Sequence, residues 1–160
     1  MKKIDLARQY CLTGTPSNAL HKLNRYIRDV KGLKEALIRH GYHSPVARRM
    51  VTILVEMLLD PLRRVWGRPI VISSGYRCPE LNILIGGAKH SHHLLGCAAD
   101  LIAGSPDDHR LLFRLIQETH ELCGLEFTQL ILEPGARWIH ISYVPGNLRC
   151  QVIDKEKSPN

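Results

Sequence analysis

The residues in this chain best suited to metal chemistry are His93, Asp100 and His140. The first two lie in the stretch from Ser73 to Asp100, and the third follows in the segment RWIHIS. Two histidine nitrogens and a carboxylate oxygen can hold one zinc ion and leave a fourth position open for water. Asp100 also lies among small and apolar residues, where a lone carboxylate is costly unless it is paired or bound to a cation. The three residues therefore predict a catalytic zinc site rather than a closed structural one.

Two other histidines are alternatives to His93 as a ligand. His92 is adjacent to it, and His90 lies three positions earlier. Adjacent side chains in a strand point to opposite sides, so at most one of His92 and His93 would face the site. Spacing alone does not choose among the three histidines.

Short strands are predicted around these candidate ligands. The expected strands are residues 69–72, 96–102, 127–133, 137–143 and 149–153. Pro134-Gly135 is a turn sequence, so the third and fourth strands should form a hairpin. Because side chains alternate along a strand, Trp138, His140 and Ser142 should share one face of the fourth strand, opposite to its isoleucines. A catalytic histidine would then stand on one side of the sheet and core residues on the other.

Helices are predicted before and between these strands. Ser44-Pro45 and Ser105-Pro106 each place a serine N-cap before a proline at the first helical position. The first helix is expected to bend or end near Pro61 and to be over by Gly67. Gly124 is the expected end of the second helix, because glycine favours the left-handed conformation that closes a helix. Pro79 starts a shorter helix.

Apolar residues recur every three or four positions in both long helices, which predicts one buried face on each. Met50 and Met57 are expected to fill the core beneath the first helix. His109 and His120, in the second, are expected to be exposed.

Composition is that of a globular chain, with 44% hydrophobic residues, enough for a core. We therefore predict an α+β fold with a small, mostly antiparallel sheet, helices packed on one side and the metal at the sheet face. The five cysteines are odd in number and form no C-x-x-C, which indicates reduced thiols rather than a disulfide framework.

The net charge of +7 favours an anionic partner. The basic residues are scattered and no nucleic-acid-binding motif is present, so the sequence argues against nucleic acid as that partner. No apolar run reaches membrane-spanning length, and MKKIDLARQY has no apolar segment typical of a signal peptide. We expect synthesis in the cytoplasm and no membrane partner. The oligomeric state is not readable from the sequence.

Several motifs together resemble a known family. In order, they are SGYRCPELN, IGGA, S-x-H-x-x-G-x-A-x-D and W-x-H-x-S, within residues 50–143. This pattern resembles the zinc peptidases that cut bacterial cell-wall peptides: D-alanyl-D-alanine carboxypeptidases, L-alanyl-D-glutamate endopeptidases and phage endolysins. The hedgehog signalling domains share that fold. We therefore expect a peptidase domain at 44–153. The resemblance does not cover residues 1–43, where apolar residues at helical spacing predict a helical extension, and residues 154–160 form a polar tail.

The resemblance implies roles for individual residues. His93, Asp100 and His140 would bind the single zinc ion, and the S-x-H element selects His93 over His92. Arg77 matches the substrate-facing arginine, which would bind a substrate carboxylate or stabilise the oxyanion formed at the scissile carbonyl. Ser91 would contact substrate or support a ligand.

The general base is where the chain departs from the family. Many relatives have an acidic residue three positions before the last histidine ligand, and here that position is Arg137. Glu133 is the nearest upstream acid, and the hairpin could bring it beside the metal, so we predict Glu133 as the base. Trp138 could wall the substrate cleft.

The resulting hypothesis is zinc-assisted hydrolysis of an amide bond in a peptidoglycan stem peptide, of the D-Ala-D-Ala or L-Ala-D-Glu type. A phage or prophage endolysin, released through a membrane pore, would reconcile this activity with cytoplasmic synthesis. The first alternative is a non-catalytic zinc-bearing binding module on the same fold. The second, suggested by charge alone, is a basic protein that binds nucleic acid.

Overall fold

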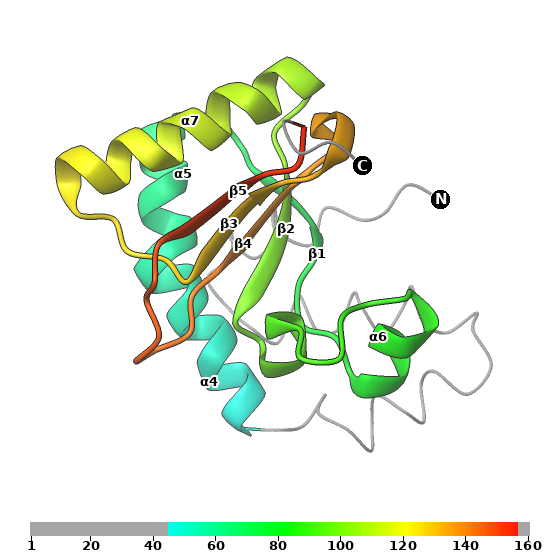
Figure 1. The fold of residues 1–160 in the computed structure, drawn as a ribbon. Helices are drawn as coiled ribbons and strands as arrows, with labels where there is room; N and C mark the ends of the chain where they lie inside the picture. The colour runs from blue at the N-terminus through cyan, green and yellow to red at the C-terminus, as the bar shows by residue number, and fades with distance from the viewer. Residues whose placement is uncertain (1–44, 157–160) are drawn as a thin grey trace.

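The five-stranded sheet is the element around which the described chain is built (Figure 1). In this computed structural model, residues 45–156 are described. The expected extension at 1–43 and the last residues of the tail lie outside them. The strands are β1 (Val71–Ser74), β2 (Ala98–Ile102), β3 (Gln129–Leu132), β4 (Ile139–Ser142) and β5 (Gln151–Asp154).

The strand order is β1-β2-β4-β3-β5, and every neighbouring pair is antiparallel except β3 and β5, which run parallel. The predicted α+β fold with a mostly antiparallel sheet is therefore confirmed, with one parallel pair at the edge. The pairing of β2 with β4 sets Asp100 directly opposite His140. Residues directly opposite each other project from the same face of a sheet, so this register alone brings two candidate ligands together.

The helices are α4 (Pro45–Leu54), α5 (Asp60–Trp66), α6 (Pro79–Leu84) and α7 (Pro106–Cys123). Ser105 is the N-cap of α7, as predicted: the Ser105 hydroxyl accepts a hydrogen bond from the Asp108 amide, and the Asp108 side chain accepts from the Ser105 amide. It ends at Gly124 in the left-handed conformation, also as predicted. No helix in residues 45–156 is long and apolar enough to cross a membrane.

A π-helical turn, η1 (Val55–Leu59), joins α4 to α5. An extra residue per turn shifts the buried side of the following helix. As a result the buried residues are Leu54, Leu58, Leu59, Leu62 and Trp66. Met57, expected in the core, is instead 53% exposed.

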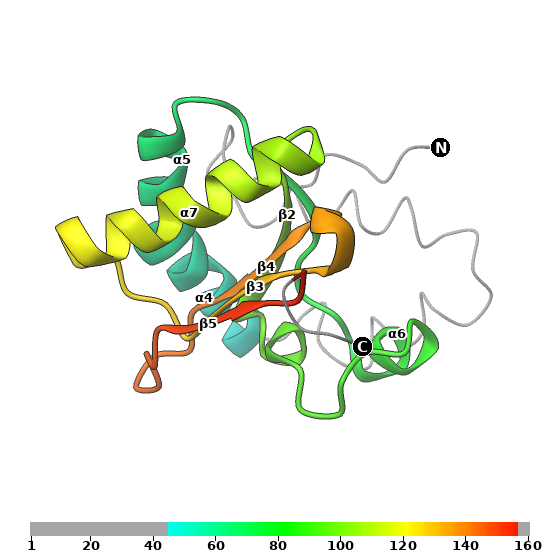
Figure 2. The ribbon, with the colours of Figure 1, turned by 45° about the horizontal axis from the view of Figure 1, so that its top comes forward.

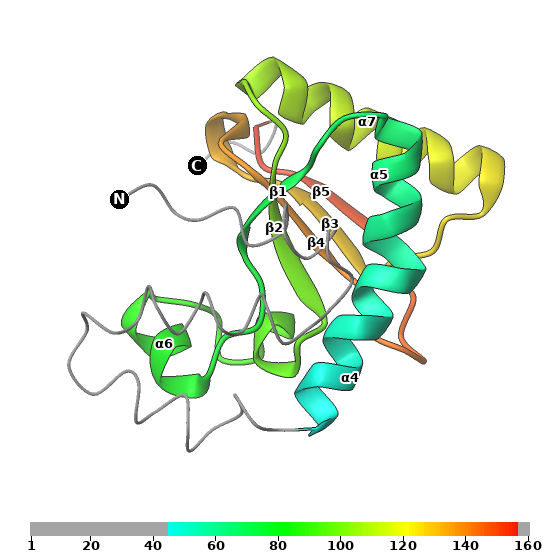
Figure 3. The same cartoon turned by 180° about the vertical axis from the view of Figure 1, so that it is seen from behind.

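Helices α4, α5 and α7 bury one face of the sheet. Ile139 and Ile141 of β4 and Leu101 of β2 are fully buried in one cluster with apolar residues of these helices. Helix α7 lies next to α5, whereas α6 lies apart from both (Figures 2 and 3). The opposite face of the sheet, which carries Asp100 and His140, is thus free of these three helices.

The expectation that His109 is exposed was wrong. The side chain is 3% exposed, and its Nδ1–H donates to the carbonyl of Ala136 at 2.6 Å. This hydrogen bond joins α7 to the short 3-10 turn η3 (Pro134–Ala136), where Ala136 has a positive φ of 46°. A buried polar group needs such a partner, and helical periodicity does not reveal one that is 27 residues away.

Candidate metal centre

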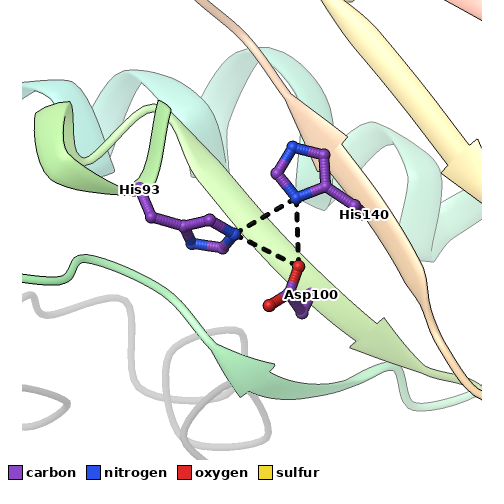
Figure 4. Close-up of side chains that lie close together, drawn as sticks. All are labelled: His93, Asp100 and His140. Carbon is purple, nitrogen blue, oxygen red and sulfur yellow. Dashed lines mark hydrogen bonds and ion pairs between the residues drawn. The ribbon is translucent and has the colours of Figure 1, made fainter. Parts of the chain in front are cut away.

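His93, Asp100 and His140 are brought together by three different elements (Figure 4). Asp100 is in the middle of β2, His140 is opposite it on β4, and His93 belongs to the 3-10 turn η2 (His92–Leu95) that precedes β2. The hydroxyl of Ser91 caps this turn by accepting from the His93 amide at 3.3 Å. A local cap therefore fixes the backbone of His93, whereas sheet pairing positions the other two residues.

Gly96 closes the turn that carries His93. Its φ is +74°, a conformation that side chains with a Cβ rarely adopt. A Cβ there would also lie 2.9 Å from the carbonyl oxygen of Ala47. The glycine of the S-x-H-x-x-G motif thus lets η2 turn directly into β2 while packed against α4.

The possible ligand atoms of the cluster face one another. His93 Nε2 lies 3.1 Å from Asp100 Oδ1 and 3.1 Å from His140 Nδ1, and His140 Nδ1 lies 3.0 Å from Asp100 Oδ1. His93 is 1% exposed and Asp100 is 7% exposed. Three ligand atoms this close together, with little access to water, form a compact and largely dry site.

The protonation of His93 tests whether the cluster fits a cation. Its Nδ1 lies 2.7 Å from the carbonyl oxygen of Gly75, which can only accept, so Nδ1 carries the proton. Nε2 of the neutral ring then presents a lone pair to Asp100 and His140. Burial lowers the pKa of His93, although Asp100 opposes this, and the neutral form is the one that binds metal. Two nitrogens and an anionic oxygen at one point match the donor set of zinc.

Asp100 is anionic in this site. Burial alone would raise the pKa of its carboxyl group, but its polar and charged neighbours, His140 first among them, outweigh burial and hold the pKa well below its usual range. The expected burial cost of a lone carboxylate is thus offset by partners on both oxygens.

Arg77 binds the second oxygen of Asp100. Its Nη2 donates to Asp100 Oδ2 at 2.5 Å, its Nε donates to Ser74 Oγ at 2.8 Å, and its backbone amide donates to the carbonyl of His93. The side chain is 13% exposed. Two of the three guanidinium nitrogens of Arg77, which was predicted to face the substrate, therefore bind Asp100 and Ser74. Its Nη1 has no partner within residues 45–156.

His92 does not join the cluster. Its Nδ1 lies 2.9 Å from the hydroxyl of Ser142, two residues beyond His140 on β4. Burial lowers the pKa of His92, and nearby His140 and Arg149 add to this effect. The structure therefore groups His93, and neither His92 nor exposed His90, with the other two candidate ligands.

Glu133 lies on the same face of the sheet as His140, but its carboxylate is paired with Lys155 and does not contact the cluster. Ile131 is opposite His140. Glu133 lies two residues beyond Ile131, directly after the end of β3, and its amide donates to the carbonyl of Trp138. Both Glu133 carboxylate oxygens accept from Lys155 Nζ, at 2.9 and 2.8 Å. Trp138 is half-buried, and the guanidinium of Arg137 lies 4.9 Å from its ring. The predicted base is thus near the metal face but paired with Lys155 rather than with the cluster.

Comparison with known proteins identifies the family of this chain. The sequence model of the family described as peptidase M15 matches residues 21–142. The chain belongs to the peptidase M15 family. A similar curated protein is the zinc D-Ala-D-Ala carboxypeptidase of Streptomyces albus G, which is 34% identical over 93 residues. The match covers 57% of this chain and 33% of that protein, so the chain spans about a third of its relative's length.

Three interactions of this M15 chain were missed by sequence reasoning. They are the Gly75 carbonyl on His93, the Ser142 hydroxyl on His92 and the Lys155 ammonium on Glu133. Ser142 had a visible signal, since alternation places it on the face of His140. The other two depend on a loop carbonyl and on a strand pairing, neither of which has a signature in residue type.

Proposed function

We propose that this chain is a zinc-dependent peptidase that hydrolyses an amide bond in peptidoglycan stem peptides. The observation that carries the proposal is the convergence of His93 Nε2, Asp100 Oδ1 and His140 Nδ1 in an almost dry site on the sheet face that α4, α5 and α7 leave uncovered. Family membership and the similarity to a zinc D-Ala-D-Ala carboxypeptidase support it. The bond cut would be of the D-Ala-D-Ala or L-Ala-D-Glu type.

A zinc ion held by His93, Asp100 and His140 would supply a Lewis acid that makes a water molecule acidic near neutral pH. Glu133 would accept the proton and return it to the leaving amine. To do so, its carboxylate must leave Lys155, and the 41% exposure of the lysine side chain means that water screens their attraction.

The substrate would be held by residues on the same face. The Nη1 group of Arg77 is available to the carbonyl oxygen on which negative charge develops. Trp138 would form a wall of the cleft. Ser91 would act mainly through His93, because its hydroxyl already accepts from the His93 amide.

Zinc content and release of amino groups from purified peptidoglycan test the proposal in wild type, Glu133→Gln and Lys155→Ala. We expect one zinc per chain in all three, and a loss of cleavage of roughly 100- to 10,000-fold in Glu133→Gln alone. Exposed Glu121 on α7 offers a matched control, Glu121→Gln, which should cleave like wild type. Equal losses in Glu133→Gln and Lys155→Ala would mean that Glu133 matters only through its ion pair, and the base would be another group.

A non-catalytic zinc-binding module is the second candidate. It is favoured by one observation: among residues 45–156, no acid other than Asp100 contacts the cluster, and Glu133 is paired with Lys155. A wild-type protein that holds zinc, binds peptidoglycan and releases no amino groups would establish this function instead.

The proposal extends to the biological setting of an endolysin made in the cytoplasm of a phage-infected or prophage-carrying cell. Its expression in a bacterium should then leave the cells intact until a pore-forming protein or a solvent permeabilises the inner membrane. Turbidity measured before and after permeabilisation tests this, with Asp100→Ala as the inactive control. Lysis without permeabilisation would contradict it.

A further inference from the structure

The metal face of β4 carries a second histidine contact besides the cluster. Ser142 has a fully buried side chain, and it follows His140 at the next position that projects from the same face. Its hydroxyl lies 2.9 Å from Nδ1 of His92, and this is its one hydrogen bond within residues 45–156. His92 is half-buried.

This single contact determines where the His92 proton lies. A serine hydroxyl has one proton, and a buried donor without an acceptor costs about 1–3 kcal/mol. If His92 Nδ1 carried the proton, it would donate to Ser142, and the hydroxyl proton of Ser142 would have no acceptor among the described residues. The favoured arrangement has Ser142 donating to Nδ1, which leaves the ring proton of His92 on Nε2.

His92 and His93 therefore differ in whether a ring nitrogen is free to bind a ligand. Both nitrogens of His93 are engaged, one by Gly75 and the other by the cluster. The Nε2–H of His92 has no partner within residues 45–156. The charges of His140 and Arg149 act on His92, and Arg149 is an exposed residue whose guanidinium has no acidic partner among those residues.

We propose that His92, held by Ser142, is a substrate-binding residue whose Nε2–H donates to an acceptor oxygen of the peptide beside the metal centre. This inference rests on the proposed peptidase function and adds a residue that binds the substrate to it. The acceptor is either the terminal carboxylate of the peptide or an internal carbonyl. Both offer the same lone-pair oxygen to a neutral N–H donor, and Arg149 favours the carboxylate because its positive charge acts on His92.

The test compares wild type with His92→Ala and His92→Gln in the full-length, zinc-loaded protein. The probe is an N-acetylated peptide that wild type cleaves, and its affinity for the zinc-free protein is also measured by calorimetry. We expect His92→Ala to weaken peptide binding and raise KM by roughly 10- to 100-fold, with zinc content unchanged. His92→Gln, which keeps an N–H donor, should recover part of the loss. His90→Gln, at an exposed histidine two residues away, is the matched control and should match wild type.

A second arm distinguishes the two acceptors. The same peptide is prepared with a free carboxylate and with a terminal amide. A loss in His92→Ala confined to the free acid assigns the carboxylate, and an equal loss for both peptides assigns an internal carbonyl. If His92→Ala binds and cleaves both peptides like wild type, the inference is wrong while the proposed function stands. A wild-type protein that cleaves no stem peptide would instead overturn the proposed function.

Ser142 is assigned a positioning role, and the imidazole nitrogen signals of His92 report on it directly. Nitrogen NMR distinguishes a ring protonated on Nε2 from one protonated on Nδ1, and the spectrum of His92→Gln identifies the signals. We expect wild type to show the Nε2–H form and Ser142→Ala to show a mixture, with a smaller loss of peptide affinity than His92→Ala. An Nδ1–H ring in wild type would overturn the inference, because His92 would then present an acceptor.

Discussion

The two faces of strand β4 use neighbouring residues in opposite ways. Ile139 and Ile141 are fully buried beneath the helices, and their contribution is apolar area removed from water. His140 and Ser142 point to the other side, where His140 meets His93 and Asp100 and Ser142 meets His92. The helix-covered face is stabilised by apolar packing, which needs no particular bonding partner. The metal face consists of polar groups, each of which needs a specific hydrogen-bond or metal partner.

This difference separates stability from chemistry along a single strand. Burying the cluster is unfavourable for folding unless each nitrogen and oxygen is satisfied, and here the partners are Gly75, Arg77 and the three cluster residues themselves. A bound cation would satisfy the three converging atoms together. Substitutions on the apolar face should therefore change the free energy of unfolding, and those on the metal face should change zinc affinity.

The largest effect is expected for His140→Ala. Removal of one of three ligand atoms should lower zinc affinity by more than the roughly 10- to 100-fold typical of losing an outer partner, and it should abolish peptide cleavage. Zinc content after dialysis and a chelator competition measure the loss. Zinc binding of unchanged affinity in this variant would show that His140 is not a ligand.

On the opposite face, Ile141→Ala should destabilise the fold and spare the site. Truncation of a fully buried isoleucine costs about 2–5 kcal/mol, because a cavity is left in the core. Urea unfolding of the zinc-free protein measures this, and zinc stoichiometry below the transition should stay at one per chain. Val152→Ala at a 41% exposed position of β5 is the control and should cost far less.

Arg77→Ala should show an intermediate effect, because Arg77 acts on the metal face through Asp100. Without the arginine, Asp100 Oδ2 loses its hydrogen-bond donor and the carboxylate is free to rotate away from the two histidines. We expect zinc affinity to fall by roughly 10- to 100-fold. Ser74→Ala, which removes only the contact to Arg77 Nε, should cost less. If Arg77→Ala binds zinc like wild type but cleaves poorly, its role is limited to the substrate.

Local rules predicted much of this arrangement. The N-cap Ser105 and the C-cap Gly124 of α7 follow from residue types within a few positions. The alternation of side chains along β4 correctly placed His140 on the opposite face from its isoleucine neighbours. The donor types of His93, Asp100 and His140 suggested a metal site before any fold was known. The choice of His93 over His92 came from the S-x-H motif and not from spacing.

Features that depend on long-range pairing were not predictable in the same way. The π-helical turn moved Met57 out of the core, and no residue in VEMLL marks it. The ion pair of Glu133 depends on β5 lying parallel to β3, which places Lys155 beside it. The burial of His109 depends on a carbonyl 27 residues away. Each of these is decided by which segments meet in the folded chain, and residue types along one segment do not specify that.

The smallest expected effect lies at the start of α7, a helix that packs on the apolar face of the sheet. Ser105→Ala should lower the free energy of unfolding by about 0.5–2 kcal/mol by removing the cap, with no change in zinc affinity.

Hydrogen bonds from the Ser105 amide and hydroxyl, together with Arg68, lower the pKa of Asp108 from its ordinary value to about 2. A carboxyl group whose pKa is lowered by folding stabilises the fold above its unfolded pKa and loses that contribution as the pH falls. Asp108→Asn should therefore be less stable than wild type at pH 7, and the difference should shrink between about pH 4 and about pH 2.

Urea unfolding of the zinc-free proteins across this pH range measures the contribution of Asp108. Asp107→Asn makes the same change of charge one residue earlier but lies outside the capping box, so it should have a smaller effect at pH 7. If Asp108→Asn and wild type differ equally at pH 7 and at pH 2, the cap does not depend on an ionised Asp108. A loss of zinc affinity in either variant would mean that the helix start and the metal face are coupled through η3, which α7 contacts, and the separation of stability from chemistry would not extend beyond β4.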